Sequence, residues 1–151
     1  MKLVVMTKST YFVEEDKILT ALFEEGLDNL HISKTEKSTL YLERLLSLIP
    51  NTYHRYITVH QHYHLKAEKS LAGIHLDTEN AVPPIGYKGQ IGRTCRNSML
   101  LKEMRRSSDY VFLANIYNSG RNKFDEEHTF SDLELNELKD QGLLGKRVYA
   151  M

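Results

Sequence analysis

Six short apolar runs recur along this chain, and each of them ends in a polar residue. Buried parallel strands are covered on both faces, so they read as continuous apolar segments rather than as alternating ones. Most runs are followed by a stretch with helical spacing, at intervals of roughly 20–30 residues, as in repeated strand–helix units. The pattern therefore predicts an α/β fold with a parallel sheet. The runs are residues 3–6, 30–32, 57–59, 73–76, 90–92 and 110–114.

The segments between these runs carry the signals of helix ends. Gly26 is a natural C-terminal stop for the first helix, and Ser38, Asn97 and Ser131 are expected to cap later ones. Glu134 lies three residues after Ser131, which is the spacing of a capping box. The predicted helices span residues 14–26, 39–49, 64–72, 97–106 and 131–144, and residues 146–151 resemble a seventh strand.

Charge and cysteine content indicate which partners and which cellular compartment to expect for this chain. Twenty basic residues balance twenty acidic ones, so no overall field favours nucleic acid or an anionic membrane surface. The only cysteine, Cys95, excludes an internal disulfide, suits a reducing compartment and is expected to be a small core residue. No apolar run approaches the length of a membrane span. These features predict a cytoplasmic protein with neither nucleic-acid nor membrane partners.

Ligands of parallel α/β folds bind at the carboxyl ends of the strands, so the polar residues there are the first candidates for chemistry. Seven strands with no eighth leave two interpretations open: an open doubly wound sheet, or a barrel that stops before its last unit. The polar residues that end the six runs are Thr7, Ser33, His60, Asp77, Arg93 with Thr94, and Asn115.

Five segments, taken in order, resemble the thiamine phosphate synthase (thiamine-phosphate pyrophosphorylase) family. No single motif is decisive, and the order and spacing over nearly the whole chain carry the resemblance. The segments are residues 4–8 (VVMTK), 26–35 (GLDNLHISKT), 73–80 (GIHLDTEN), 91–97 (IGRTCRN) and 109–123 (DYVFLANIYNSGRNK).

The resemblance implies a fold and a reaction. The fold is a (β/α)8 TIM barrel, here truncated after strand 7, with residues 1–151 forming a single domain. The reaction is a transfer in thiamine biosynthesis: a hydroxymethylpyrimidine diphosphate loses pyrophosphate, and a thiazole phosphate attacks the resulting cation. The expected partners are these two phosphorylated small molecules, with a homo-oligomer as a further possibility.

The resemblance also assigns site residues. Substrate-binding positions correspond to His31, Lys34, His60, Thr94, Ser119, Gly120, Arg121 and Lys123. Among them, Lys123 and Thr94 are the expected catalytic residues. The family holds Mg²⁺ with two carboxylates, but Gln61 and Asn80 stand at those positions. Asp77 is therefore the expected metal ligand, with Glu79 nearby.

Three alternatives stay open. A non-catalytic barrel that binds a phosphorylated ligand fits the lost carboxylates. A thiazole tautomerase paralogue would need a histidine where Arg96 stands. A metal-dependent hydrolase would use His60, His62 and His64 together with His31 and His75. Against the hydrolase, His75 in an apolar strand is equally well a hydrogen-bonded core residue, and His62 and His64 are expected to begin a helix at the rim.

Overall fold

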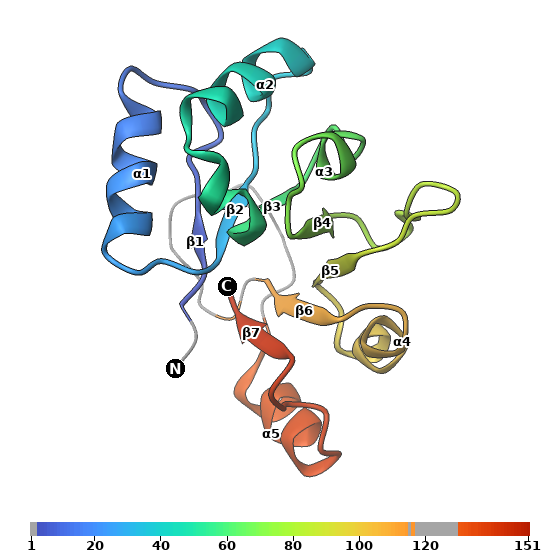
Figure 1. Cartoon of the computed structure of the whole chain (residues 1–151). Helices are drawn as coiled ribbons and strands as arrows, with labels where there is room; N and C mark the ends of the chain where they lie inside the picture. Colours follow the sequence, from blue (N-terminus) through green and yellow to red (C-terminus); the bar gives the residue numbers. More distant parts are fainter. Residues whose placement is uncertain (1–2, 115, 117–129) are drawn as a thin grey trace. The chain divides into compact units, whose positions relative to one another are not determined.

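The computed structural model describes residues 3–114, 116 and 130–151 (Figure 1). The chain divides into two compact units, Met1–His75 with Gly86–Gly89, and Leu76–Ile85 with Gln90–Met151. Both units are built from parallel strands connected through helices, and the strand order follows the chain order in each. The predicted α/β class is therefore confirmed. The closed eight-stranded barrel stays a prediction.

The first unit alternates short strands with helices. Its helices α1 and α2 lie side by side in Figure 1 and contact each other. The ring of Phe23 in α1 stacks on that of Tyr53 at a centroid distance of 4.9 Å, which ties α1 to η1, the 3₁₀ helix that follows α2. The elements are β1 (Val5–Met6), α1 (Glu15–Glu24), β2 (Leu30–Ile32), α2 (Thr39–Leu48), η1 (Asn51–Tyr56), β3 (Ile57–Val59), α3 (Leu65–Glu68) and β4 (Gly73–Leu76), whose last residue belongs to the second unit.

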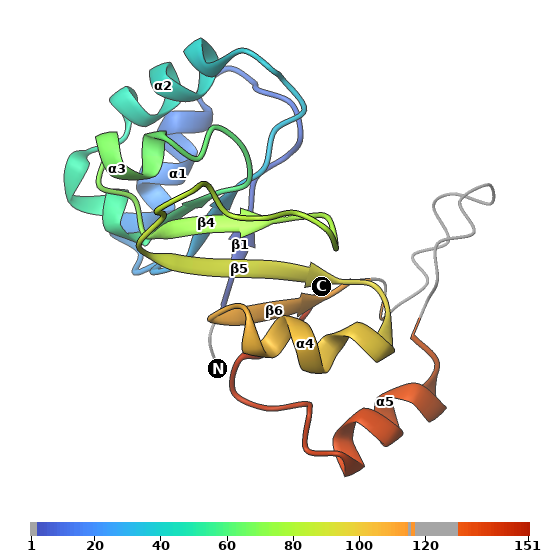
Figure 2. The same cartoon turned by 90° about the vertical axis from the view of Figure 1, so that its right-hand side faces the viewer.

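The second unit packs two helices against three strands. Helix α4 runs along β5 and β6 in Figure 2 and contacts both of them. Its elements are β5 (Gln90–Cys95), η2 (Ser98–Leu100), α4 (Leu101–Arg106), β6 (Tyr110–Leu113), α5 (Asp132–Asp140) and β7 (Val148–Ala150). The core that joins them consists of Cys95, Leu101, Met104, Val111, Leu113, Phe130 and Leu138.

Strand β5 is twice as long as predicted. The apolar pattern ends it at Gly92, but the structure extends it through Arg93 and Thr94 to Cys95. Parallel pairing with β6 continues over this stretch, with Thr94 opposite Phe112 and Cys95 opposite Leu113. Backbone pairing overrides side-chain polarity here, so the prediction that Thr94 lies beyond the strand end is wrong.

Helix ends follow the sequence signals in most places. The Asn97 side chain accepts a bond from the Met99 N–H, and Ser131 forms the predicted capping box with Glu134. Gly26 ends α1 at a φ of 98°, a conformation that favours glycine. Ser38 occupies the predicted N-cap position of α2, but its side chain makes no capping bond. Helix α3 is shorter than predicted and is followed by Ser70 at a φ of 55°.

Among the described residues, no helix combines the length and the apolar character needed to cross a membrane.

Candidate functional site

Three histidines of the first unit come from three successive strands. His31 lies in β2, His60 directly follows β3, and His75 lies in β4. The register pairs His31 with Thr58, two residues before His60, and pairs Thr58 with Gly73, two residues before His75. Because side chains alternate between the two faces of a strand, all three imidazoles lie on the same face.

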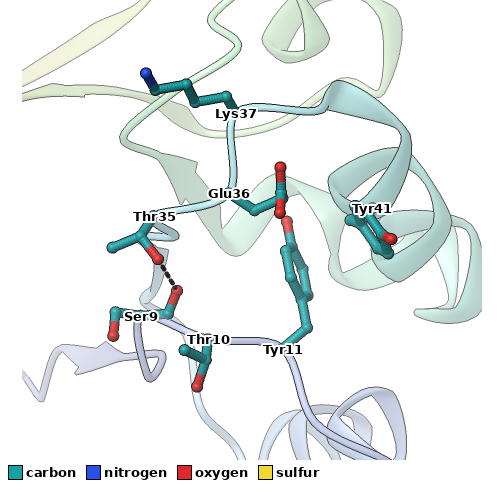
Figure 3. Close-up of a pocket in the computed structure, with 7 residues that line it drawn as sticks. All are labelled: Ser9, Thr10, Tyr11, Thr35, Glu36, Lys37 and Tyr41. Atoms are coloured by element: carbon teal, nitrogen blue, oxygen red, sulfur yellow. Dashed lines mark hydrogen bonds between the residues drawn. The ribbon is translucent and has the colours of Figure 1, made fainter.

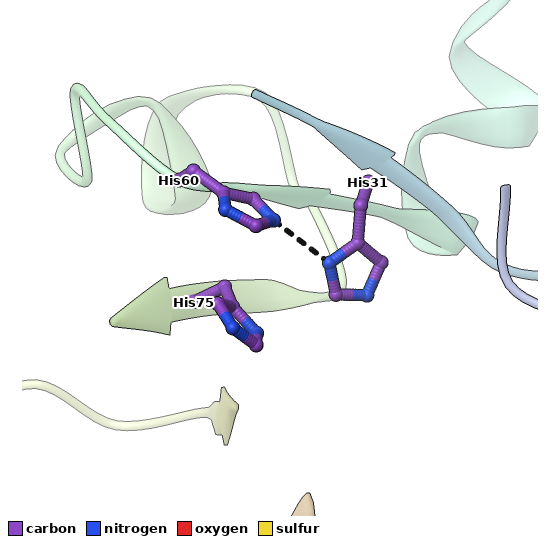
Figure 4. Close-up of side chains that lie close together, drawn as sticks. All are labelled: His31, His60 and His75. Atoms are coloured by element: carbon purple, nitrogen blue, oxygen red, sulfur yellow. Dashed lines mark hydrogen bonds between the residues drawn. The ribbon is translucent and has the colours of Figure 1, made fainter. Parts of the chain in front are cut away.

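The three side chains form a compact buried group, here called the histidine trio (Figure 4). The Nδ1 of His31 and the Nε2 of His60 are 2.9 Å apart and share a hydrogen bond. The His60 and His75 rings stack at 4.4 Å, and the His31 ring meets both edge-on. One nitrogen from each ring lies within 4.8 Å of the others, close enough for the trio to hold a metal ion.

Burial keeps the His31 imidazole neutral. Desolvation lowers the pKa of His31 from 6.5 to about 3, and the neighbouring charge of His60 adds to this effect. A neutral imidazole offers one N–H donor and one acceptor nitrogen, which suits contact with a heterocycle or a metal.

Lys34 is buried and paired rather than exposed at the mouth of a site. Its ammonium lies 2.5 Å from the Oε1 of Glu15 and donates to the Thr10 carbonyl oxygen at 3.2 Å. It also sits 4.5 Å from the centre of the Tyr11 ring. Lys34 is therefore a neutralised cation in this structure, and a phosphate would compete with Glu15 for it.

A pocket of about 510 Å³ opens beside this buried ion pair (Figure 3). Burial, with the carboxylates of Glu15 and Glu36 adding to it, raises the pKa of the Tyr11 hydroxyl from 10.0 to about 12. The Tyr11 hydroxyl is thus a neutral donor towards a ligand at neutral pH. The pocket is lined by Ser9, Thr10, Tyr11, Thr35, Glu36, Lys37 and Tyr41.

Neither of the two positions at which the family holds Mg²⁺ carries a carboxylate here, and Asp77 is the carboxylate expected to replace them. Gln61 is an amide, and its Oε1 accepts the Lys34 backbone N–H at 3.1 Å. In the second unit Asp77 is half-buried after β4, and its carbonyl oxygen accepts a 2.7 Å bond from Arg96. Mg²⁺ is bound in proteins by one or two carboxylates together with substrate phosphates and water. The donor set thus fits Mg²⁺ only as Asp77 combined with oxygens of a bound diphosphate.

Thr94 and Cys95 lie near the end of β5 with opposite orientations. Cys95 packs into the helix-side core, so the alternation of the strand turns Thr94 to the other face, on which Phe112 and Tyr149 lie. Both residues are almost fully buried. Burial raises the pKa of the Cys95 thiol, which confirms a core residue rather than a reactive one.

The structure brings together only part of the predicted set. His31 and His60 meet, and Lys34 lies in the same unit, whereas Thr94 and Asp77 belong to the second unit. The predicted phosphate-loop residues, Ser119, Gly120, Arg121 and Lys123, lie outside the described residues.

The sequence grouped His75 with His31 and His60 only in the metal-hydrolase alternative, and the structure brings these three together because neighbouring parallel strands share a face. One partner escaped the sequence-based analysis. Glu15 binds Lys34 from the start of α1, and no local pattern indicates that pairing. His62 and His64 do not join the trio: His62 shares a hydrogen bond with the Thr39 hydroxyl, and His64 directly precedes the short helix α3 without a capping bond.

Comparison with solved structures places this arrangement in a family. A thiamine phosphate pyrophosphorylase from Bacteroides thetaiotaomicron is 43% identical, with a TM-score of 0.86 over 99% of this chain and 71% of that one. A thiamine phosphate pyrophosphorylase from Pyrococcus furiosus is 15% identical over 99% of this chain and 74% of that one, and its TM-score of 0.73 supports the fold alone. A scan of protein-family models and a search of curated proteins found no match. At 43% identity over nearly its whole length, the chain belongs to the thiamine phosphate pyrophosphorylase family.

Proposed function

We propose that the chain is a thiamine-phosphate synthase-type transferase. It would join a hydroxymethylpyrimidine diphosphate to a thiazole phosphate and release pyrophosphate. The observation that carries the proposal is the 43% identity to a thiamine phosphate pyrophosphorylase over 99% of the chain. The ordered motifs, each of which overlaps a parallel strand, support the same conclusion.

The substrate roles follow from the chemistry of each group. His31, whose pKa burial lowers, shares a hydrogen bond with His60, and the two imidazoles are suited to hydrogen-bond a pyrimidine ring. The Thr94 hydroxyl and the Lys123 ammonium would bind phosphate oxygens, and Lys123 would offset charge that develops on the leaving pyrophosphate. Ser119, Gly120 and Arg121 complete the proposed binding loop for the thiazole phosphate.

Mg²⁺ is part of the proposal through Asp77. When bound, the ion would neutralise charge on the diphosphate. Asp77 would supply one carboxylate oxygen to the ion, together with oxygens of the diphosphate.

A non-catalytic barrel that binds a phosphorylated ligand is the second candidate. The buried pairing of Lys34 with Glu15 favours it, because this cation is already neutralised and offers less to a diphosphate. The amides Gln61 and Asn80 in place of two carboxylates point the same way.

Turnover separates the two candidates. The purified chain is incubated with the pyrimidine diphosphate, the thiazole phosphate and Mg²⁺, and thiamine phosphate is measured. The transferase predicts product that disappears with EDTA and with Lys123→Ala, while Lys102→Ala, which removes an exposed lysine of α4, leaves turnover unchanged. Asp77→Asn should raise the Mg²⁺ concentration needed for half-maximal turnover.

Each other outcome decides against a candidate. No product, with thiazole phosphate still bound and Lys123→Ala weakening that binding, would exclude the transferase and support the binding barrel. No product and no binding of either phosphate would exclude both.

A further inference from the structure

The histidine trio occupies positions that parallel β/α folds ordinarily fill with apolar side chains. Side chains facing the inside of such sheets are dominated by Val, Ile and Leu. His31 and His75 are fully buried, and His60 is 3% exposed. Imidazole is the commonest metal ligand in proteins, so three imidazoles on one buried face form a candidate site for a metal ion.

We propose that His31, His60 and His75 bind a divalent transition-metal ion of the Zn²⁺ class through one ring nitrogen each. The inference does not rest on the proposed function, although it shares His31 and His60 with the proposed pyrimidine site, because it concerns binding of the ion in the absence of any substrate. It also differs from the Mg²⁺ expectation, which rests on carboxylate and phosphate oxygens.

The geometry of the trio is close to that of three zinc ligands. Two nitrogens bound to one tetrahedral Zn²⁺ at about 2.0–2.1 Å lie roughly 3.3–3.4 Å apart. The His31 and His60 nitrogens are now 2.9 Å apart, and all three ligand atoms lie within 4.8 Å of one another. Ring rotations that move the nitrogens by roughly 1 Å would therefore form the site.

The backbone holds these rings at fixed positions. Two of the side chains belong to paired strands and the third directly follows one, and the register aligns all three on one face. The Tyr63 hydroxyl donates to the His75 carbonyl oxygen at 3.2 Å, which anchors the end of β4. Sites built on strands are held more precisely than sites on loops.

The donor chemistry selects the class of ion. Imidazole suits Zn²⁺, Cu²⁺ and Ni²⁺, whereas Mg²⁺ and Ca²⁺ require oxygen ligands. In the described part of the chain, this group of possible metal ligands consists of the three histidines and includes no carboxylate. Three protein ligands leave a fourth position for water or an anion, as in zinc sites with an open coordination position.

Binding of the metal ion needs no additional reactant, because only one proton changes its position. One of the two bonded nitrogens of His31 and His60 carries the shared proton. For both nitrogens to bind the ion, that proton moves to the other nitrogen of its ring, so the ring changes tautomer and stays neutral.

Metal titration of the full chain without an affinity tag tests the site. The chain is stripped with EDTA, dialysed and titrated with Zn²⁺ by calorimetry, and Co²⁺ is used as a spectroscopic probe. We expect one ion per chain and a visible Co²⁺ spectrum of tetrahedral intensity. His60→Gln and His75→Gln should each weaken Zn²⁺ binding by more than about 100-fold, since even partners of a ligand are worth 10–100-fold. The matched control is His64→Gln, an exposed neighbour outside the trio, which should bind as the unmodified chain does.

A second measurement covers the case in which the variants do not fold. In histidine-ring NMR spectra of the unmodified chain, one equivalent of Zn²⁺ should shift the signals of three of the seven histidines. The proposal is overturned if the unmodified chain binds no Zn²⁺ at micromolar concentration. It is also overturned if the shifted signals belong to His62 and His64, or if His64→Gln abolishes binding.

Discussion

The ammonium of Lys34 lies 2.5 Å from the Oε1 of Glu15, and both side chains are almost completely withdrawn from solvent. Glu15 Oε2 is buried without a hydrogen-bond partner among the described residues, so this single ion pair carries most of the compensation for two buried charges. Removal of one member leaves the other charge uncompensated. Glu15→Gln should therefore lower the free energy of unfolding by about 3–5 kcal/mol in urea denaturation.

An exposed ion pair at the start of the same helix supplies the control for the effect of burial. Lys17 and Glu14 are 2.7 Å apart, but both side chains are more than 60% exposed. Glu14→Gln should change the free energy of unfolding by no more than about 1 kcal/mol. Equal losses in the two variants would contradict the importance of burial.

The buried His31 should make stability depend on pH. The pKa of His31 is about 3 in the folded chain and 6.5 when the imidazole is fully solvated, as in the unfolded chain. Between these two pH values only the unfolded chain binds the extra proton. This contribution is complete above pH 6.5 and is lost as the pH falls towards 3, with a slope of up to about 1.4 kcal/mol per pH unit. Urea denaturation with EDTA, repeated from pH 7 to pH 4.5, measures it.

Two variants assign that slope to its source. His31→Gln should flatten it by about one proton, whereas the exposed His64→Gln should leave it unchanged. A slope that survives His31→Gln would show that another group takes up the proton.

Two serines at helix starts should respond differently to the same substitution. The Ser131 side chain accepts the Glu134 N–H, and the Ser131 N–H donates to the Glu134 carboxylate. Ser131→Ala should cost about 1 kcal/mol in the free energy of unfolding. Ser38 makes no capping bond, so Ser38→Ala should cost almost nothing. Similar costs at both sites would show that intrinsic helix propensity, rather than the cap, determines them.

The thiol of Cys95 should be inert in the folded chain. It is fully buried, and its Sγ–H donates to the Asn97 carbonyl oxygen at 3.1 Å. Burial raises its pKa, which reduces the reactive thiolate. Reaction with a disulfide reagent should be slower by on the order of 100-fold or more than in urea. Comparable rates in both states would place the thiol at the surface.

Much of the local structure was predictable from the sequence. The six apolar runs located β1 to β6 because strands buried on both faces require continuous apolar residues, and residues 146–151 contain β7 as predicted. Gly26, Asn97 and Ser131 marked helix ends because their capping bonds are local. The extension of β5 was not predictable, since it depends on pairing with β6, a strand that the sequence places later in the chain.

The candidate site was only half predictable for a related reason. The sequence by itself determined the parallel α/β class, the family motifs and the polar residues that end the strands, because each of these depends on residue type and local spacing. The sequence also offered five histidines as one possible metal site, but only the tertiary structure decided that His31, His60 and His75 are the three that meet, and that Glu15 neutralises Lys34. Both depend on the register and packing of segments distant in the sequence, and no local pattern of residues encodes a distance between them.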